Sequence, residues 1–191
     1  MYKRVFLIHG WGGNPNNCWF PWLKEKLESK GFEVIVPNMP DSENPKIKNW
    51  VSFLKKQIGV VDKNTYFVGH SIGCQTIMRY LQDTPDKTKV GGVIFVAGFF
   101  NLPFLKTKIE KKIAKAWLEI PIDTNKIKSL CKSNNIVAIF SDDDPDVPLT
   151  DSKLFKERLN AKIIVKHKKG HFSDDAGVFK LPVVLKELLS M

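Results

Sequence analysis

The pattern of apolar and polar residues along the chain is of two kinds, one typical of strands and one typical of helices. Short apolar runs rich in Val, Ile and Phe favour buried strands, and between them apolar residues recur at the spacing of amphipathic helices. The expected strands cover residues 4–9, 33–37, 65–69, 90–98, 135–141 and 161–167. The expected helices cover residues 19–30, 47–58, 72–82, 106–118, 152–159 and 181–189.

This order of elements predicts a doubly wound, three-layer α/β/α domain. Strands that are apolar on both faces and alternate with helices favour a mostly or wholly parallel sheet of about six strands, covered on both sides. With 191 residues, the chain is expected to form a single domain over residues 1–191. Ligands of such sheets bind beyond the carboxyl ends of the strands, so polar residues directly after a strand are the candidates for function.

Composition narrows the protein class. No apolar run reaches the roughly 20 residues that cross a bilayer, and the apolar run near the first residue is shorter than the core of a signal peptide. We therefore expect a cytoplasmic protein without a membrane span. The three cysteines, Cys18, Cys74 and Cys131, are far apart, which favours reduced thiols over a disulfide framework.

The net charge of +10 raises the question of a nucleic-acid partner. Only three of the 30 basic residues are arginine, whereas base and phosphate recognition favours arginine, and the lysines are spread along the chain. A compositional bias therefore explains the charge better, and no nucleic-acid partner is expected. In the densest basic stretch, residues 106–117, Ile109, Ile113 and Ala116 share one helical face, which is typical of a solvated helix.

The third expected strand ends in the sequence GHSIG, in which Ser71 lies between Gly69 and Gly73. Glycines two residues before and after a serine permit the sharp strand-to-helix turn that exposes a nucleophilic hydroxyl. The alternative is a glycine-rich turn in which Ser71 caps the following helix. The pattern is common by chance, so its weight depends on a base, an acid and an oxyanion site at the same edge of the sheet.

The candidate base is His171, which follows the last strand in a loop at this edge. A serine hydroxyl needs a base within hydrogen-bond reach. Three other histidines compete for this role. His9 is expected to bond the backbone of its own loop, the side chain of His70 to diverge from that of Ser71, and His167 to belong to the strand.

The candidate acid lies in the segment SDDDPDVP after the fifth strand. We choose Asp144 because Pro145 restricts its backbone and so fixes its direction. Asp142 is the main alternative, while Asp143 and Asp146 could cap a helix or face water. The order serine, aspartate, histidine along the chain is the order of the α/β hydrolases.

Two backbone N–H groups are expected to stabilise an oxyanion. One belongs to Ile72, directly after the serine, and the other to Trp11 in the glycine-rich loop HGWGG, with Gly12 as the alternative. That loop lacks the Lys-Ser/Thr of a phosphate-binding loop, and no cluster with metal-ligand spacing is present. No cofactor and no metal are therefore expected.

Taken together, the motifs FLIHGWGGNPNNCWFPWL, VGHSIGC, DDDPDVP and KKGHF resemble the compact serine hydrolases related to retinoblastoma-binding protein 9. The resemblance runs over residues 3–188 in the same order, with Ile72 where leucine is frequent. It implies a small α/β-hydrolase core without a large cap and activity on ester-like acyl substrates. Ser71, Asp144 and His171 match the positions of the triad.

Aromatic residues close to the candidate motifs are the candidates for substrate contact. Trp19, Phe99 and Phe100, with Trp11 and Phe20, are expected to form an apolar wall near the serine, although aromatic residues at strand ends are also ordinary packing. The expected function is hydrolysis of a small carboxylic ester or related acyl bond. The alternatives are an amidase, thioesterase or peptidase with the same triad, and a protein-binding module with weak or no turnover.

Overall fold

The computed structural model describes residues 2–132 and 134–191 and contains a six-stranded, wholly parallel sheet. The strands are β1 (Arg4–Ile8), β2 (Glu33–Ile35), β3 (Thr65–His70), β4 (Gly92–Val96), β5 (Ile136–Ser141) and β6 (Lys162–Lys166). They lie in the order β2-β1-β3-β4-β5-β6. The helices are α1 (Phe20–Glu28), α2 (Ile47–Ile58), α3 (Ile72–Gln82), α4 (Lys108–Glu119), α5 (Thr124–Leu130), α6 (Asp151–Leu159) and α7 (Pro182–Ser190).

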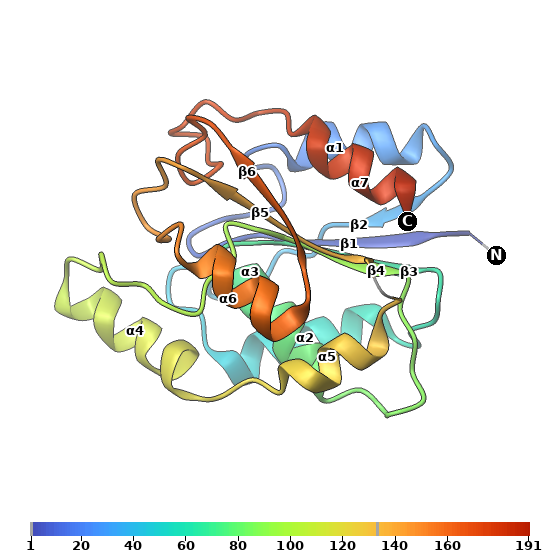
Figure 1. Cartoon of the computed structure of the whole chain (residues 1–191), viewed down its shortest axis with the longest axis horizontal. Coiled ribbons are helices and arrows are strands. Elements are labelled where there is room, and N and C mark those ends of the chain that lie inside the picture. The colour runs from blue at the N-terminus through green and yellow to red at the C-terminus, as the bar shows by residue number, and fades with distance from the viewer. Residues whose placement is uncertain (1, 133) are drawn as a thin grey trace.

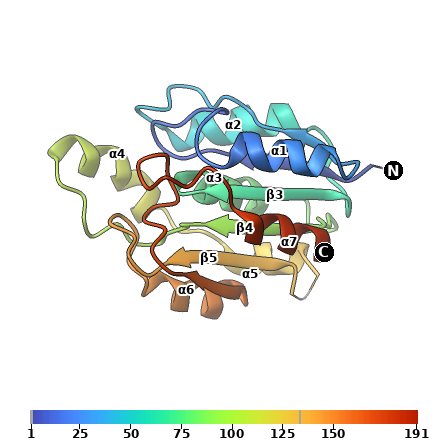
Figure 2. The ribbon, with the colours of Figure 1, turned by 90° about the horizontal axis from the view of Figure 1, so that it is seen from above.

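The helices cover both faces of the sheet. Helices α1 and α7 lie on one face and α2, α3, α5 and α6 on the other, while α4 lies beyond the tips of the strand arrows (Figure 1). Figure 2, seen from above, shows the arrows of β3, β4 and β5 pointing to the same side as α4. The expected α/β/α fold with a parallel six-stranded sheet and no large cap is confirmed.

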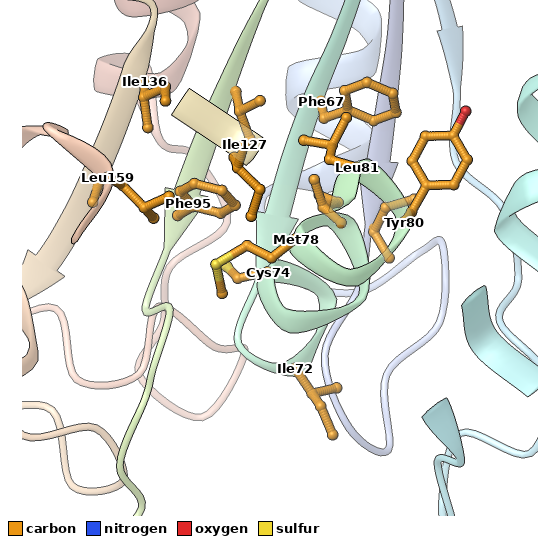
Figure 3. Close-up of a cluster of buried hydrophobic side chains, with 14 of the residues drawn as sticks. Phe67, Ile72, Cys74, Met78, Tyr80, Leu81, Phe95, Ile127, Ile136 and Leu159 are labelled. Carbon is orange, nitrogen blue, oxygen red and sulfur yellow. The ribbon is translucent and has the colours of Figure 1, made fainter. Parts of the chain in front are cut away.

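Side chains that alternate along each strand build two core layers. Phe67 and Phe95 point to the layer under α3, whereas the neighbouring Val68 and Ile94 point to the layer under α1 and α7. Helix α3 packs against the first layer, and its Cys74, Ile77, Met78 and Leu81 are fully buried. Figure 3 shows Cys74, Met78 and Leu81 of this helix among the side chains of the layer. Because both faces are covered, every position of β3 and β4 is buried and most of their residues are apolar, as expected for a parallel sheet.

The helix α5 was not expected from the sequence. Its seven residues, TNKIKSL, bury only Ile127 and Leu130, so the sequence carries too few apolar positions to show a helical period. Asp123 starts the helix by accepting a hydrogen bond from the N–H of Lys126 (3.0 Å). A short helix defined by its cap and two anchors is therefore hard to recognise in the sequence.

The described part of the chain holds no helix long and apolar enough to cross a membrane. Its three cysteines are free thiols, as expected. Burial raises the pKa of Cys18 to about 11 and that of Cys131 to about 12, which keeps both groups protonated at neutral pH. The cytoplasmic location and the single domain over residues 1–191 stay predictions.

Candidate active site

The turn between β3 and α3 holds Ser71 in a strained backbone conformation, with φ 53° and ψ −122°. Both flanking glycines are required by close backbone contacts. A Cβ on Gly69 would lie 2.7 Å from the backbone N of Cys74, and a Cβ on Gly73 would lie 2.7 Å from the carbonyl O of His9 and still closer to that of Ile8. The Gly-x-Ser-x-Gly pattern is thus explained by packing of backbone on backbone.

The hydroxyl of Ser71 does not cap α3. No side-chain hydrogen bond to the first turn of the helix is formed there. The turn is instead held through the backbone, since the Ser71 N–H donates to the carbonyl of Val96 (2.9 Å) and the Ser71 carbonyl accepts from Cys74 (3.0 Å). The capping alternative therefore fails.

A histidine–carboxylate pair lies at the same edge of the sheet. The Nδ1 atom of His171 lies 2.9 Å from Oδ2 and 3.0 Å from Oδ1 of Asp144. The side chain of Asp144 is only 3% exposed, and its Oδ1 accepts the N–H groups of Asp146 (2.9 Å) and Val147 (3.0 Å). These bonds fix the carboxylate and leave Nε2 as the free nitrogen of the His171 ring.

The two preceding acids hold the loop that carries His171. Asp142 pairs with Nδ1 of His167 (2.6 Å), and Asp143 accepts the N–H of Gly170 (2.8 Å). The bond with His167 lowers the pKa of Asp142, and a hydrogen bond from the Ser141 hydroxyl lowers that of Asp143. Asp142, the alternative acid, is thus engaged with another histidine.

The competing histidines near Ser71 have other partners. His9 accepts the N–H of Met39 at Nε2 (3.0 Å), so its Nδ1 carries the proton and donates to the carbonyl of Gly10 (2.9 Å). Burial lowers the pKa of His9 and lowers that of His70 to about 3. His70 donates from Nε2 to the backbone carbonyl of His171 (2.7 Å), and neither histidine is placed as the base.

The two backbone donors expected for the oxyanion differ in their surroundings. Ile72 is the first residue of α3, where N–H groups have no acceptor inside the helix. In the loop after β1, the N–H of Gly12 donates to the carbonyl of Ser42 (2.8 Å), whereas within the described residues the N–H of Trp11 meets no acceptor. Trp11 is therefore the better candidate, and its indole bonds the Glu43 carbonyl (3.0 Å), which fixes the loop.

Two cavities meet at Ser71 and His171, and Trp11 and Asp146 line both. The first has a volume of about 320 Å³ and a polar wall that includes Asn17, Asp174 and Asp175. The second has a volume of about 210 Å³ and an apolar wall of Ile72, Phe99, Leu102 and Leu105 beside Glu110. The serine and the histidine thus face one shared space with a polar and an apolar side.

Of Trp19, Phe99 and Phe100, three aromatic residues expected to bind substrate, only one lines a cavity at Ser71. Phe99 lines the apolar cavity. Trp19 is fully buried against Phe20 and lines neither cavity at Ser71. Phe100 packs on Phe155 (ring centroids 4.9 Å apart) and lines neither cavity. Trp19 and Phe100 therefore lie outside the space that Ser71 faces.

Sequence reasoning missed most of the polar wall. Asp174 accepts the backbone N–H of Cys18 (2.6 Å) and the side-chain amide of Asn17 (2.7 Å), which joins two segments more than 150 residues apart. The pair Asp174 and Asp175 follows His171 by three and four residues, so proximity to the candidate base was the one available signal.

One group of potential metal ligands occurs among the described residues. Atoms of Asp144, Asp146 and His171 lie within 4.8 Å of one another. In this group Nδ1 of His171 already bonds Asp144, so a metal at that nitrogen would break the pair described above. The expectation of no metal and no cofactor stays a prediction.

The sheet order and the strained serine turn place the chain among the α/β hydrolases. It matches the Serine hydrolase family over residues 5–190 and belongs to that family. The resemblance expected from the motifs is therefore confirmed.

Individual relatives agree with this assignment. YdeN of Bacillus subtilis is 34% identical over 191 residues, which cover 100% of this chain and 96% of YdeN. Its crystal structure matches with a TM-score of 0.89 over 98% of this chain and 97% of YdeN. Serine hydrolase RBBP9 of Rattus norvegicus is 28% identical over 90% of this chain and 88% of its own. Est1E of Butyrivibrio proteoclasticus shares the fold, with a TM-score of 0.68, 16% identity and coverage of 98% of this chain and 89% of Est1E.

Proposed function

We propose that this hydrolase cleaves a small carboxylic ester or a related acyl bond through a Ser71–His171–Asp144 triad. The observation that carries the proposal is the fixed pair of His171 and Asp144, which faces the same space as the strained Ser71. Membership of the Serine hydrolase family supports hydrolysis.

The roles of the three side chains follow from their chemistry. Nε2 of His171 takes the proton of the Ser71 hydroxyl as the oxygen attacks the acyl carbon. Asp144 holds the ring through Nδ1 and stabilises the imidazolium that forms. The N–H groups of Ile72 and Trp11 donate to the oxyanion of the tetrahedral intermediate.

The intermediate collapses when the leaving group takes the proton from His171. The acyl group then remains bound to Ser71 as an ester. His171, neutral again, removes a proton from a water molecule, whose oxygen attacks the acyl carbon. When the bond between the acyl carbon and the Ser71 oxygen breaks, His171 returns this proton to Ser71 and the carboxylic acid leaves. Water is the one reactant besides the substrate that these steps consume.

The two cavities suggest how a substrate lies. The apolar wall of Phe99, Leu102 and Leu105 suits an acyl chain, and its volume of about 210 Å³ suits a short one. The polar cavity, with Asn17 and Asp174, suits the leaving group. The substrate is thus expected to be a small molecule with a short apolar acyl part and a polar leaving part.

The proposal is tested with a fluorophosphonate probe and a panel of p-nitrophenyl esters, thioesters and aminoacyl amides. The folded protein should be labelled at Ser71 and should hydrolyse at least one ester, while Ser71→Ala should show neither reaction. Folded protein that stays unlabelled would overturn the mechanism. Turnover of amides or thioesters without esters would assign another leaving group to the same triad.

A further inference from the structure

Helix α4 and the segment before it form a short cap, residues 99–120, at the carboxyl edge of the sheet (Figures 1 and 2). The C-terminal end of α4 is anchored to the nucleophile helix α3. The buried guanidinium of Arg79 donates to the carbonyls of Trp117 (2.9 Å) and Ile120 (2.8 Å). The indole of Trp117 is buried and donates to the carbonyl of Pro45 (2.9 Å).

The first half of the cap is exposed instead. Phe104 is 52% and Ile109 is 72% exposed, although contact of an apolar side chain with water is unfavourable in free energy. Leu102 and Leu105, from the same segment, line the apolar cavity at Ser71. Apolar surface on the outside of the cap thus adjoins the apolar wall of the site.

Lysines flank these apolar residues in the sequence. Lys106, Lys108, Lys111 and Lys112 are all exposed, and within residues 2–132 and 134–191 no carboxylate pairs with any of them. The acid among them, Glu110, accepts the backbone N–H groups of Lys106 and Thr107 at the start of α4. Cations at a helix N-terminus are unfavourable to the helix, so helix stability does not explain this placement.

We propose that residues 104–115 dock the enzyme on an anionic phospholipid surface. The lysines complement the negative headgroups, and Phe104 and Ile109 enter the boundary between headgroups and acyl chains. Docking there places the mouth of the apolar cavity next to the lipid surface. The docking itself does not depend on the proposed hydrolysis.

The test uses the full chain with Ser71→Ala, so that no substrate or lipid is consumed. It should sediment with phosphatidylcholine vesicles that contain about 30% phosphatidylglycerol at low salt, and less at high salt. Binding to pure phosphatidylcholine should be weaker by at least about 10-fold. Lys111→Gln with Lys112→Gln should lower the partition coefficient about 30-fold. Ile109→Ser should lower it by about 10-fold.

Matched controls change the same chemistry elsewhere. Lys30→Gln with Lys186→Gln removes two exposed lysines on the side of α1 and α7, and Val60→Ser changes a residue that is 85% exposed, outside the cap. Each control should change the partition coefficient less than about 3-fold. Equal losses in control and cap variants, or no binding to anionic vesicles, would overturn the proposal.

A soluble anionic acyl substrate is the competing occupant of this surface. In the active protein, the lysine variant would then raise KM for a soluble anionic thioester without vesicles. Vesicle binding would be unchanged, and that result would also overturn the proposal. Hydrolysis of p-nitrophenyl acetate, which carries no charge, should stay unchanged and shows that the variant is folded.

A second, independent observation concerns His70, the neighbour of Ser71. Its ring is buried, lies 5.0 Å from the ring of His171 between centroids, and makes edge contacts with Trp19 (6.2 Å) and Phe20 (6.5 Å). The ring donates to the backbone carbonyl of His171 over 2.7 Å. The backbone φ at the next residue, Phe172, is 54°, so the loop turns sharply at this bond.

We infer that His70 is a positioning residue that sets the direction of the His171 ring toward Ser71. The elbow then fixes both partners of the proton transfer, because one rigid turn carries the nucleophile and the donor that holds the base. The inference rests on the proposed function.

The test compares His70→Leu, which removes the donor, with His70→Gln, whose amide N–H can still donate. The leucine variant should lower kcat about 100-fold with KM nearly unchanged, since misplacement of a catalytic group reduces the rate steeply. The kcat of the glutamine variant should lie within about 5-fold of the parent's kcat. Trp19→Phe, which alters packing on His70 and keeps the bond, should leave kcat within about 3-fold.

Equal kcat for the leucine variant and the parent, or an equal loss with Trp19→Phe, would overturn the inference. Should His70→Leu not fold, His70→Asn serves instead, because its amide is too short to reach the carbonyl. Absence of turnover in the parent itself would contradict the proposed function and not the role of His70.

Discussion

The elbow at residues 69–73 and the first half of the cap, residues 104–112, lie at the same edge of the sheet. They differ in how closely their atoms pack and in how much of their surface is exposed. In the elbow, backbone atoms pack so closely that Gly69 and Gly73 cannot carry a Cβ. In the cap, Ile109 is 72% exposed and four lysines have no carboxylate partner among the residues that the structure describes. Chemistry requires fixed atoms, whereas contact with a substrate or a surface requires exposed ones.

The largest expected effect lies at Asp144, the acid of the proposed triad. Asp144→Asn should lower kcat about 10⁴-fold, because an amide cannot stabilise the imidazolium and favours the wrong tautomer of His171. Asp142→Asn, a matched change two residues away, should stay within about 3-fold because Asp142 pairs with His167. Ester hydrolysis by both purified variants checks this. An equal loss of kcat in both variants would show that Asp144 is not the acid.

The second effect concerns the stability of the elbow. Gly73→Ala should lower the free energy of unfolding by about 3 kcal/mol or more, because the new Cβ meets backbone carbonyls that cannot move aside. Gly31→Ala, in open space at φ +82°, should lower it by only about 1–2 kcal/mol through backbone strain. Urea unfolding of both variants measures the difference. A loss no larger for Gly73→Ala would contradict the close packing.

A smaller effect should appear with pH. Burial lowers the pKa of His70 to about 3, below its value of about 6.5 in the unfolded chain, so the unfolded state binds more protons between these values. Stability should therefore fall as the pH drops below about 6.5, by about 1.4 kcal/mol from His70 alone at pH 5.5.

The charged and titratable groups near His70 are His171, Asp144 and His9, and the pKa of His9 is lowered by burial as well. His70→Gln should remove the part of the pH dependence that His70 contributes. Urea unfolding at about pH 8 and about pH 5.5 measures this slope in both proteins. An unchanged slope in the glutamine variant would show that His70 is not the group that titrates.

The smallest effect is expected in the cap. Ile109→Ala should change the free energy of unfolding by no more than about 0.5 kcal/mol, since its side chain is mostly exposed. Ile77→Ala, in the buried face of α3, should cost about 2–5 kcal/mol. Thermal and urea unfolding check both values. A large loss at Ile109 would mean that it packs against the body of the protein.

The sequence predicted the fold well because its signals are local. Apolar runs on both faces of each strand and the glycines around Ser71 follow from the packing of a parallel sheet and a sharp turn. Helix α5 was not predicted, because only two of its residues, Ile127 and Leu130, are buried, which is too few to show a helical period.

The walls of the site were less predictable, because distant segments form them. Trp19 and Phe99 both follow glycine-rich stretches or strand ends, yet one is enclosed by the core and the other faces a cavity. The bond between Asp174 and Cys18 joins segments more than 150 residues apart. Only the assembled tertiary structure distinguishes these cases.

The three consecutive aspartates after β5 fix the number of residues in two segments, 142–144 and 167–171, more strictly than they fix the residue types there. Each bonds a different position of the loop 167–171, in the same order along both segments. Removal of one residue from either segment would give His171 the wrong partner or none, even with every side chain type still present. Relatives of this enzyme are therefore expected to tolerate substitutions at the first two aspartates far better than an insertion or a deletion between β5 and Asp144.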